Sequence, residues 1–368
     1  MDARFDIDAL RPDLGAVDLK CAIFQNLPLD PLHREWLKRR AWVRTVHGTT
    51  RIEGNTLSDL EVEQLLDNRA SRSLPRKDAL EVLGTRAALT FVDEIASDDG
   101  IPIDQAAMQE IHRRVLEGQG ALLTPGEYRR GENRVGGPDG DIIFTTPPSG
   151  DVPVLMRALA DWLGGDTSTA APIRAAVAHL EFVAIHPFND GNGRTARALS
   201  RLLLMRGGYA LEGLVSLDAW LDLRRGDYFA AIRASIGQAY EPGYDATPFV
   251  SFFLRAIAGA ADHVLARLRG LGQVQIRVRR DVAEGQLAPM MLDGLVYAWI
   301  NRSLRPADYQ RVTGRGPAPA SRDLAKAERL GYIIGDGAAS ARWYRLGPKL
   351  LETPAEDETT DPRTFERR

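Results

Sequence analysis

Residues 186–197 hold the side chains in this sequence that are best suited to chemistry on a phosphorylated molecule. The segment reads His-Pro-Phe-Asn-Asp-Gly-Asn-Gly-Arg-Thr-Ala-Arg. His186 is its only side chain that titrates near neutral pH, so it could accept a proton from an attacking hydroxyl. Asp190 supplies a hard oxygen of the kind that Mg²⁺ binds, commonly together with the phosphates of a substrate. A base and a metal ligand so close together indicate a catalytic segment.

The second half of the segment is suited to binding a polyphosphate. Glycine and asparagine tolerate left-handed backbone angles, so the amides of Gly191, Asn192 and Gly193 can turn toward an anion. Arg194 and Arg197 fall on one face of a helix, where planar guanidinium groups can each bind phosphate oxygens. These residue types predict a phosphate site at the N-terminus of a helix.

Two helices must hold this segment in place. Residues 171–185 carry Pro172 near their start and apolar residues at helical spacing, which predicts a helix that ends just before His186. Residues 195–205 repeat apolar residues on one face and are followed by a pair of glycines, which predicts a second helix. The segment is therefore predicted to be a tight turn between two helices.

The same segment resembles the signature of the Fic family: His-Pro-Phe, one variable residue, Asp or Glu, Gly-Asn-Gly-Arg, two variable residues, Arg. Every fixed position is matched by residues 186–197. A lone histidine or a lone Gly-x-Gly would usually be structural, but a structural turn has no need of a carboxylate, two arginines and a histidine together. The resemblance implies an enzyme, a nucleotidyltransferase that uses ATP and Mg²⁺. Such an enzyme transfers AMP to a Tyr, Ser or Thr hydroxyl of a target protein and releases pyrophosphate.

The resemblance also implies roles for single residues. His186 would deprotonate the target hydroxyl, Asp190 would hold Mg²⁺, and Phe188 would anchor the loop in the core. The residues expected to bind the nucleotide are Asn189, Gly191, Asn192, Gly193, Arg194 and Arg197. Within this set the two arginines would neutralise the β- and γ-phosphates, as phosphoryl-type transfer requires.

Glu53 follows a predicted helix over about 32–51 and would by itself be an unremarkable exposed residue. Residues 49–54, however, read Thr-Thr-Arg-Ile-Glu-Gly. They resemble the inhibitory motif of the Fic family, which is Ser or Thr, three variable residues, Glu, then Gly or Asn. The resemblance implies that Glu53 pairs with Arg197 where the γ-phosphate of ATP should lie, so that the nucleotide binds unproductively. We therefore predict autoinhibition by Glu53.

Residues 124–148 differ from their surroundings by repeated glycines, the turn signal Pro138-Asp139-Gly140 and the β-prone run Ile142-Ile143-Phe144. This composition predicts a β-hairpin. By the resemblance, a hairpin over about 137–146 is a flap that covers the nucleotide and holds the target protein through main-chain pairing.

The whole pattern predicts a mainly α-helical protein: a Fic-type helical bundle with a β-hairpin flap, plus a small C-terminal winged helix. The predicted parts are an N-terminal helical region carrying the inhibitory helix (1–95), a Fic catalytic core (96–270), a linker helix (271–288), a winged-helix-like domain (289–347) and a disordered tail (348–368). Pro12, Pro28 and Pro31 predict a short docking arm at the start of the chain rather than a long helix. A helix over 248–268 is predicted to close the core, and His112 is assigned a structural role on a solvated helix face.

Composition and charge limit the classes of protein and the cellular compartments that fit this chain. The chain has 368 residues, a net charge of −3 and a single cysteine, Cys21. One cysteine excludes an intrachain disulfide and a cysteine-based metal cluster. The start lacks the pattern of a secretory signal, and charged residues interrupt the apolar run over 248–268. These features predict a soluble cytoplasmic protein without membrane association.

Several alternatives stay open at this point. A Fic enzyme that removes AMP would keep both His186 and Glu53. A winged-helix DNA-binding regulator with a nucleotide-sensing Fic domain is the alternative from another class. Its basic residues would be Arg315, Arg322, Lys326 and Arg329, but Asp323 and Glu328 interrupt them, which favours a protein-contact role over DNA binding. The sequence also leaves open self-modification, formation of a homodimer and the identity of the target.

Overall fold

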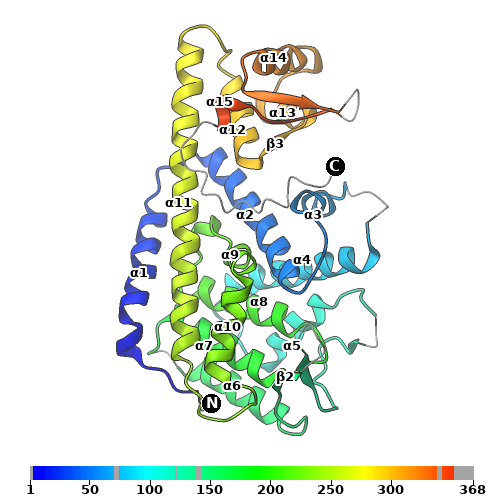
Figure 1. Cartoon of the computed structure of the whole chain (residues 1–368), viewed down its shortest axis with the longest axis vertical. Helices are drawn as coiled ribbons and strands as arrows, with labels where there is room; N and C mark the ends of the chain where they lie inside the picture. Colours follow the sequence, from blue (N-terminus) through cyan, green and yellow to red (C-terminus); the bar gives the residue numbers. More distant parts are fainter. Residues whose placement is uncertain are drawn as a thin grey trace. The chain divides into compact units, whose positions relative to one another are not determined.

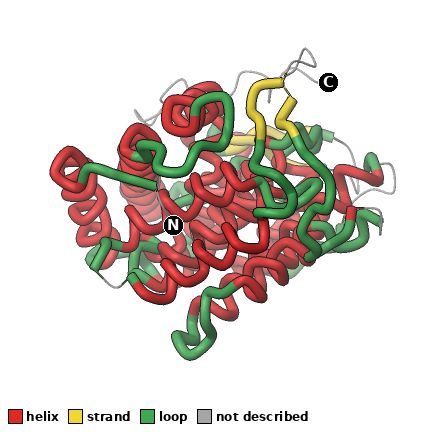
Figure 2. The backbone as a smooth tube through the Cα atoms, turned by 90° about the horizontal axis from the view of Figure 1, so that it is seen from below, coloured by secondary structure: helices red, strands yellow, loops and turns green. Residues whose placement is uncertain are grey.

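The computed structural model describes residues 3–69, 74–120, 123–136, 142–166, 168–337 and 342–351. Helices make up most of the described chain, and strands are few (Figures 1 and 2). The prediction of a mainly α-helical fold is thus confirmed. The chain divides into two compact units, of which the first holds Met1–Leu27 with Ala41–Ala261 and the second holds Pro28–Arg40 with Asp262–Arg368. This division groups most of the predicted N-terminal region with the predicted catalytic core.

Two helices form the centre of the first unit. Helix α7 (Ala171–Ile185) is buried along almost its whole length, and α8 (Asn192–Arg206) packs beside it. Helices α4 (Arg76–Ala96) and α5 (Gln105–Val115) pack together and cover α8, while α6 (Val152–Gly165) covers α7. The turn between α7 and α8 is thereby held from both sides.

The remaining elements of the first unit surround this centre. They are α1 (Ile7–Gln25), the part of α2 (Pro31–Ile52) from Ala41 onward, α3 (Asp59–Leu66), the short 3-10 helix η2 (Leu211–Gly213), α9 (Leu217–Leu223), α10 (Arg225–Ile236) and the first part of α11 (Thr247–Ala283). Backbone contacts between helices depend on small residues. A Cβ atom at Gly84 in α4 would lie 2.4 Å from the carbonyl oxygen of Val115, so the end of α5 could not approach a larger residue there.

Helix α1 shows that the predicted docking arm is wrong. It runs from Ile7 to Gln25 without a break at Pro12, and the Asp6 side chain caps it by accepting hydrogen bonds from the amides of Asp8 and Ala9. Pro12 lies on the exposed face, where the carbonyl group that it leaves unpaired can be hydrated. Tertiary burial of the opposite face, which includes Phe24, outweighs the local cost of the proline.

Helix α11 is continuous from Thr247 to Ala283, whereas the sequence predicted a closing helix and a separate linker helix divided near residue 270. The charge cluster Arg277, Arg279 and Arg280 indicated a separate linking helix. Gly270 and Gly272 lie just before it, and glycine weakens a helix by roughly 1 kcal/mol relative to alanine. Leu271 and Val278, however, continue the helical spacing and are buried in the core of the second unit. Burial therefore carries the helix through both glycines.

By length and composition alone, α11 could cross a membrane: an 18-residue window in it has a mean hydropathy of 1.4. Core helices of soluble proteins meet the same criterion, and Phe249, Phe253 and Ile257 are buried in the first unit. The absence of membrane association stays a prediction.

The predicted hairpin is present as strands β1 (Arg134–Gly136) and β2 (Ile142–Thr145), which pair antiparallel with Val135 opposite Phe144. Its turn, residues 137–141, lies outside the described residues. The base of β2 is fixed to the segment that follows α10. The amide of Thr145 donates to the carbonyl of Gln238 at 2.8 Å, and the amide of Tyr240 donates to the carbonyl of Thr145 at 2.9 Å.

The second unit contains the C-terminal elements α12 (Met291–Asn301), β3 (Ser303–Leu304), α13 (Pro306–Thr313), α14 (Pro317–Arg329), β4 (Ile333–Asp336), β5 (Trp343–Leu346) and α15 (Pro348–Leu351). Its antiparallel sheet has the order β3-β5-β4. Three helices and a hairpin occur in the predicted order, and β3 is an addition; the winged-helix assignment itself stays a prediction. Leu350 is buried, so the predicted tail boundary at 348 comes too early. Residues 352–368 lie outside the described residues.

Candidate active site

The turn between α7 and α8 depends on two left-handed residues. His186 follows the last residue of α7 with φ 51° and ψ 59°, and its amide donates to the carbonyl of Phe182 at 3.0 Å. Gly191, with φ 76°, precedes α8. The second helix thus begins at Asn192, earlier than the predicted 195, so Gly193 and Arg194 belong to its first turn. Amides in the first turn of a helix have no partner within the helix and can bind an anion.

Asn192 holds the turn together with its side chain. Its Oδ1 accepts a hydrogen bond from the amide of Phe188 at 3.0 Å, and its Nδ2 donates to the carbonyl of Phe188 at 2.8 Å. Phe188 is fully buried, as expected of an anchor. The Asn192 side chain therefore supports the loop, and only its backbone amide is left for the predicted phosphate contact.

His112, on helix α5, supports the turn, and sequence reasoning placed it wrongly on a solvated face. It is fully buried rather than solvated, and its ring stacks on Phe188 with 3.6 Å between ring centroids. The amide of Gly126 donates to its Nδ1, and its Nε2 lies 2.9 Å from the carbonyl oxygen of Asp190. Because Nδ1 accepts, Nε2 carries the proton and donates it. Burial lowers the pKa of His112 to about 4, which keeps this neutral tautomer.

A sequence signal for His112 did exist. Met108, Ile111 and Val115 on α5 are buried, and helical spacing puts His112 on the same face. The neighbouring Arg113 suggested a solvated face, but Arg113 pairs with Glu110 on the outer side of the helix.

Arg129 also supports the turn, and nothing in the sequence indicated its role. Its guanidinium donates to the carbonyl of His186 at 2.9 Å and to that of Pro147 at 2.6 Å. Its own amide donates to the carbonyl of Pro187 at 2.9 Å. Arg129 is almost fully buried and so fixes the backbone on which the predicted base stands. No pattern in the sequence marked it out among the many arginines.

The His186 side chain is set up to accept a proton. Its Nδ1 lies 3.4 Å from the carbonyl oxygen of Val183, an arrangement in which Nδ1 carries the hydrogen and Nε2 keeps its lone pair. Burial lowers the pKa of His186 to about 4, so the ring is neutral at pH 7. A neutral imidazole can act as a base, and bound phosphates nearby would favour its protonated form.

Arg194 is buried with most of its hydrogen-bonding capacity unused. It is 4% exposed, and its Nε and Nη1 atoms have no hydrogen-bond partner among the described residues. Its Nη2 lies 3.6 Å from Oδ1 of Asp190, whose side chain is 51% exposed. Buried donors without acceptors are unfavourable. They are expected where an anionic ligand will supply the acceptors.

Arg197, in contrast, is paired with a hydroxyl, a carbonyl and two carboxylates. Its Nε donates to Oγ1 of Thr49 at 2.6 Å, and its Nη2 donates to the Thr49 carbonyl at 2.9 Å and to Oε1 of Glu53 at 2.7 Å. Oδ1 of Asp218 lies 3.6 Å from Nε. Burial lowers the pKa of Arg197, but the carboxylates of Glu53 and Asp218 outweigh burial and raise it above its ordinary value. The predicted pairing of Glu53 with Arg197 is present in the structure.

Glu53 reaches this position because Gly193 has no side chain. A Cβ atom on Gly193 would lie 2.3 Å from Oε1 of Glu53, so the carboxylate rests against the backbone of the first turn of α8. The first turn of a helix is where an anion is favoured. Glu53 therefore occupies part of the predicted phosphate site with its own negative charge.

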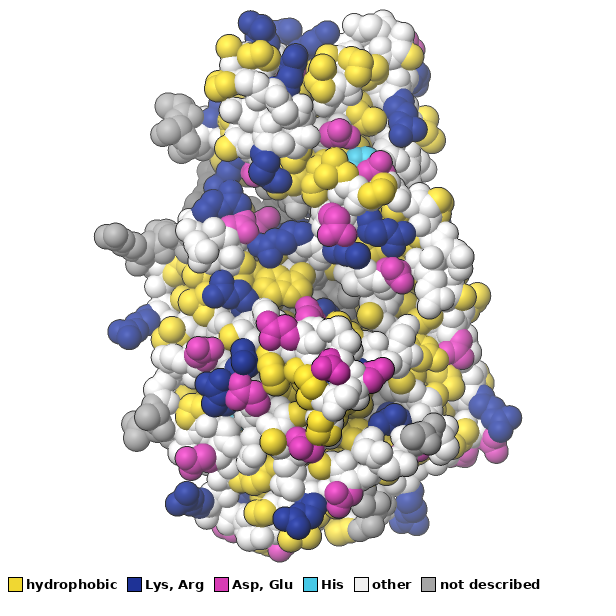
Figure 3. Space-filling model, turned by 180° about the vertical axis from the view of Figure 1, so that it is seen from behind, with side chains coloured by type: hydrophobic (Ala, Val, Ile, Leu, Met, Phe, Trp, Pro, Cys, Tyr) yellow, Lys and Arg dark blue, Asp and Glu magenta, His cyan; other side chains and the backbone are white. Residues whose placement is uncertain are grey.

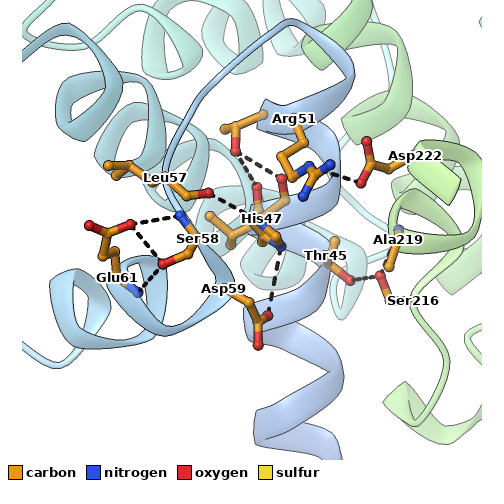
Figure 4. Close-up of polar contacts among 12 residues, drawn as sticks. Thr45, His47, Arg51, Leu57, Ser58, Asp59, Glu61, Ser216, Ala219 and Asp222 are labelled. Atoms are coloured by element: carbon orange, nitrogen blue, oxygen red, sulfur yellow. Dashed lines mark hydrogen bonds and ion pairs between the residues drawn. The ribbon is translucent and has the colours of Figure 1, made fainter. Parts of the chain in front are cut away.

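The C-terminal half of α2, which directly precedes Glu53, is tied to its neighbours from two sides (Figure 4). Toward α9, Nε of Arg51 lies 3.3 Å from Oδ2 of Asp222, and Thr45 donates to Ser216 at 2.9 Å. Toward α3, Nε2 of His47 lies 3.0 Å from the Leu57 carbonyl oxygen. These contacts fix the end of α2 and with it the carboxylate.

A metal ion could be held at this site only together with a substrate. Asp190 has a half-exposed carboxylate, whose Oδ1 also accepts from the amide of Gly191 at 2.6 Å. No group of three or more His, Cys, Asp or Glu residues suited to a metal occurs in the described part of the chain. A single carboxylate fits Mg²⁺, which commonly takes its remaining ligands from phosphates and water.

Two further features lie away from the first turn of α8, and the nucleotide-binding role of Asn189 stays a prediction. Asn189 is exposed, and its Nδ2 lies 3.4 Å from Oγ1 of Thr124 rather than against the first turn of α8. Behind Arg197, a cavity of about 50 Å³ is lined by His179 and Asp218 among others. That volume is far below the several hundred cubic ångströms typical of ligand pockets.

Comparison with known proteins agrees with this geometry. A profile of the Fic/DOC family matches residues 102–204. The chain is 36% identical over 177 residues to the protein adenylyltransferase Fic of Culex quinquefasciatus and also to that of Drosophila melanogaster. Each match covers 47% of this chain and 34% of the relative. The chain thus spans about a third of the length of these curated relatives.

Two solved structures resemble the chain in fold. A Fic family protein from Desulfovibrio desulfuricans G20 has a TM-score of 0.62 and 23% identity, covering 95% of this chain and 98% of its own. Residues 134–508 of Fic-1 from C. elegans have a TM-score of 0.57 and 28% identity, covering 70% of this chain and 72% of their own.

Proposed function

We propose that this chain, which contains a Fic-family domain, is a protein adenylyltransferase. It transfers AMP from ATP to a Tyr, Ser or Thr hydroxyl of a target protein and releases pyrophosphate. The observation that carries the proposal is Arg194, a buried guanidinium with unused donors at the N-terminus of α8. Such a group needs a strongly anionic ligand. The names of the relatives support ATP as that ligand.

The residues of the turn have complementary roles in this reaction. Nε2 of His186 accepts the proton of the target hydroxyl as its oxygen bonds to the α-phosphorus, and the bond from that phosphorus to pyrophosphate breaks. Arg194 and Arg197 neutralise the charge of the leaving group, and the free amides of the first turn of α8 add to this. Mg²⁺, held by Asp190 and the phosphates, would supply further charge neutralisation. His112 and Arg129 act indirectly, because they fix the turn.

We also propose that the chain is autoinhibited in the conformation in which Glu53 pairs with Arg197. Glu53 already neutralises Arg197 at 2.7 Å, and its carboxylate rests where phosphate oxygens would meet the helix amides. ATP can still reach Arg194, but its terminal phosphate meets a carboxylate rather than a free guanidinium. The nucleotide then binds in a pose that does not present the α-phosphorus to the target hydroxyl.

The test uses labelled ATP with Mg²⁺ and a cell lysate as the source of targets. We expect Glu53→Gly to label protein at least about tenfold faster than the unmodified chain, since a competing carboxylate has been removed. Labelling should disappear when His186→Ala is added. Glu117→Gly, which removes an exposed glutamate after α5, is the matched control and should behave like the unmodified chain. No transfer by Glu53→Gly in any lysate would contradict the proposal.

The target protein is proposed to bind along the flap of β1 and β2, which would bring its hydroxyl toward His186. The anchoring of Thr145 supports this, because it fixes the base of the flap. Self-modification and homodimer formation stay predictions, as does a cytoplasmic location.

Removal of AMP by the same site is a second candidate. The Glu53 carboxylate is near enough to act electrostatically on His186, so the two could activate a water molecule between them. With an AMP-modified substrate protein, the unmodified chain should then release AMP while Glu53→Gly should not. Equal release by both chains would exclude this role for Glu53.

Two ion pairs in the second unit argue against the alternative of a DNA-binding regulator. Nε of Arg315 pairs with Asp323 at 2.8 Å, and Nη2 of Arg342 pairs with Glu328 at 2.9 Å. On the face of the molecule in Figure 3, basic and acidic side chains are interspersed. Basic groups that are neutralised within the protein contribute little to phosphate binding. We therefore propose a protein-contact role for this unit.

A further inference from the structure

A short helix outside the signature and outside the inhibitory motif delivers a second carboxylate to Arg197. Helix α9 is capped by Ser216, whose Oγ accepts from the amide of Ala219 at 3.1 Å. It lies directly on the backbone of α2, because a Cβ atom at Gly48 would be only 2.6 Å from the nitrogen of Ala219. Asp218, in the first turn of α9, is therefore held in a fixed place beside the site.

Asp218 and Glu53 share one cation but differ in their surroundings. The Asp218 side chain is 12% exposed and lies 3.6 Å from Nε of Arg197, whereas the Glu53 side chain is 35% exposed and pairs with Nη2. Oγ1 of Thr49 accepts a hydrogen bond from the same Nε at 2.6 Å, so Nε faces both the hydroxyl and the Asp218 carboxylate. The Asp218 carboxylate is therefore buried, whereas the Glu53 carboxylate is accessible enough to be displaced.

We propose that Asp218 is a positioning residue that keeps Arg197 oriented and charge-compensated when Glu53 leaves, and that its charge limits how tightly Arg197 holds either Glu53 or a terminal phosphate. The inference rests on the proposed function in that it takes ATP as the ligand of Arg197. It adds a residue that neither sequence motif contains.

The physical reason is competition between like charges. A guanidinium that already faces a buried carboxylate attracts a second anion less strongly, because the two anions repel each other. Changing Asp218 to asparagine keeps the shape and an acceptor oxygen while removing the charge. At separations of several ångströms near a protein surface, one unit charge changes the affinity for another by about tenfold.

The experiment compares ATP binding by calorimetry in the full chain. We expect Glu53→Gly/Asp218→Asn to bind ATP about tenfold more tightly than Glu53→Gly alone. AMP, which lacks the terminal phosphates, should bind both chains equally. Asp227→Asn, which removes an exposed aspartate from α10, is the matched control for net charge and should leave ATP affinity unchanged. Unchanged or weaker ATP binding by the double variant would overturn the proposal, as would an equal change for AMP.

Thermal unfolding provides a second measurement that does not depend on nucleotide. Either carboxylate alone can balance Arg197, so each single change should lower the melting temperature only slightly. The double change leaves a buried guanidinium without a carboxylate, so its loss should exceed the sum of the single losses, and ATP should restore part of it. Additive losses would contradict the sharing of Arg197. Failure of Asp218→Asn to fold with Glu53 intact would contradict it too.

These readouts separate this inference from the proposed function. Tighter ATP binding without any transfer of AMP would leave Asp218 in its role and remove the adenylyltransferase. Transfer by Glu53→Gly with no response to Asp218→Asn would do the reverse. If no chain binds ATP, both proposals are wrong.

Discussion

Arg194 and Arg197 stand in the same turn of α8 and are equally buried, at 4% exposure each, yet their surroundings are opposite. Arg194 has nitrogen atoms without partners among the described residues and only a half-exposed aspartate nearby. Arg197 meets Thr49, Glu53 and Asp218. In the proposed anion site, the Arg194 half is therefore available to a ligand, and the Arg197 half is occupied by carboxylates of the chain itself. The proposed inhibition would thus block only one of the two cations.

The largest expected effect is on the rate of AMP transfer when Arg194 is replaced. In the Glu53→Gly background, Arg194→Met should slow AMP transfer by about a thousandfold, as loss of an arginine that stabilises transferring phosphate groups does in other enzymes. Labelled-ATP kinetics would measure it. Arg130→Met, which removes a 91% exposed arginine, is the matched control and should retain full activity. A loss of less than tenfold would show that the unpaired donors of Arg194 do not face the phosphates.

The two arginines should also differ in their effect on stability, with the larger loss expected for Arg197. Arg197→Met leaves Asp218 buried without its cation, so the free energy of unfolding should fall by about 3 kcal/mol. Arg194→Met removes donors that lack acceptors, so its effect should stay within about 1 kcal/mol and can be stabilising. Urea unfolding of both variants measures the difference. Equal losses would mean that the contrast in their surroundings has no energetic consequence.

Lowering the pH should destabilise the fold around Arg197 through protonation of His179. This residue is fully buried between Ser200 and Tyr228, and burial, with a further contribution from Arg197, lowers its pKa to about 3. An unfolded histidine titrates near 6.5, so the unfolded chain takes up the proton first. Stability is then complete above about pH 6.5 and is lost as the pH falls toward 3.

Between pH 7 and pH 5 the unmodified chain should therefore lose about 2 kcal/mol more unfolding free energy than His179→Gln. Denaturant titrations at the two pH values would measure this loss. Parallel losses in both chains would show that His179 does not remain neutral behind Arg197.

The smallest effect concerns the tie between α2 and α9. The Arg51–Asp222 ion pair at 3.3 Å is partly exposed, and such pairs contribute at most about 1 kcal/mol. Asp222→Asn should raise AMP transfer by the intact chain by about twofold to fivefold, because Glu53 is held less firmly. The same change in the Glu53→Gly background should have no effect. A rise in both backgrounds would point to a cause other than release of Glu53.

The sequence predicted the parts of the site that lie close together in the chain. The turn, its two helices and the order of functional groups all fall within residues 171–205, and local spacing determines them. The contact of Glu53 with Arg197 joins residues far apart in sequence, and only the resemblance to a known motif predicted it. Physical reasoning from spacing alone would have left Glu53 as an exposed helix end.

The residues that were missed act through long-range packing. His112 could have been found from the buried face of α5, but the adjacent arginines hid it. Arg129 and Asp218 lie outside any periodic pattern that points to the site, and their roles depend on which backbone carbonyl or guanidinium the fold brings beside them. The continuity of α1 and α11 was missed for a related reason: prolines and clustered charges are local features of the sequence, whereas burial of the opposite face is decided by the whole unit.

The bare backbone at Gly193 limits how the proposed inhibition by Glu53 could be relieved. The same missing side chain that admits the Glu53 carboxylate would admit a triphosphate, so a bulkier residue at that position would expel the inhibitor and the substrate together. Constitutively active variants should therefore arise from changes in α2 and its supports, and not from changes in the loop that performs the reaction.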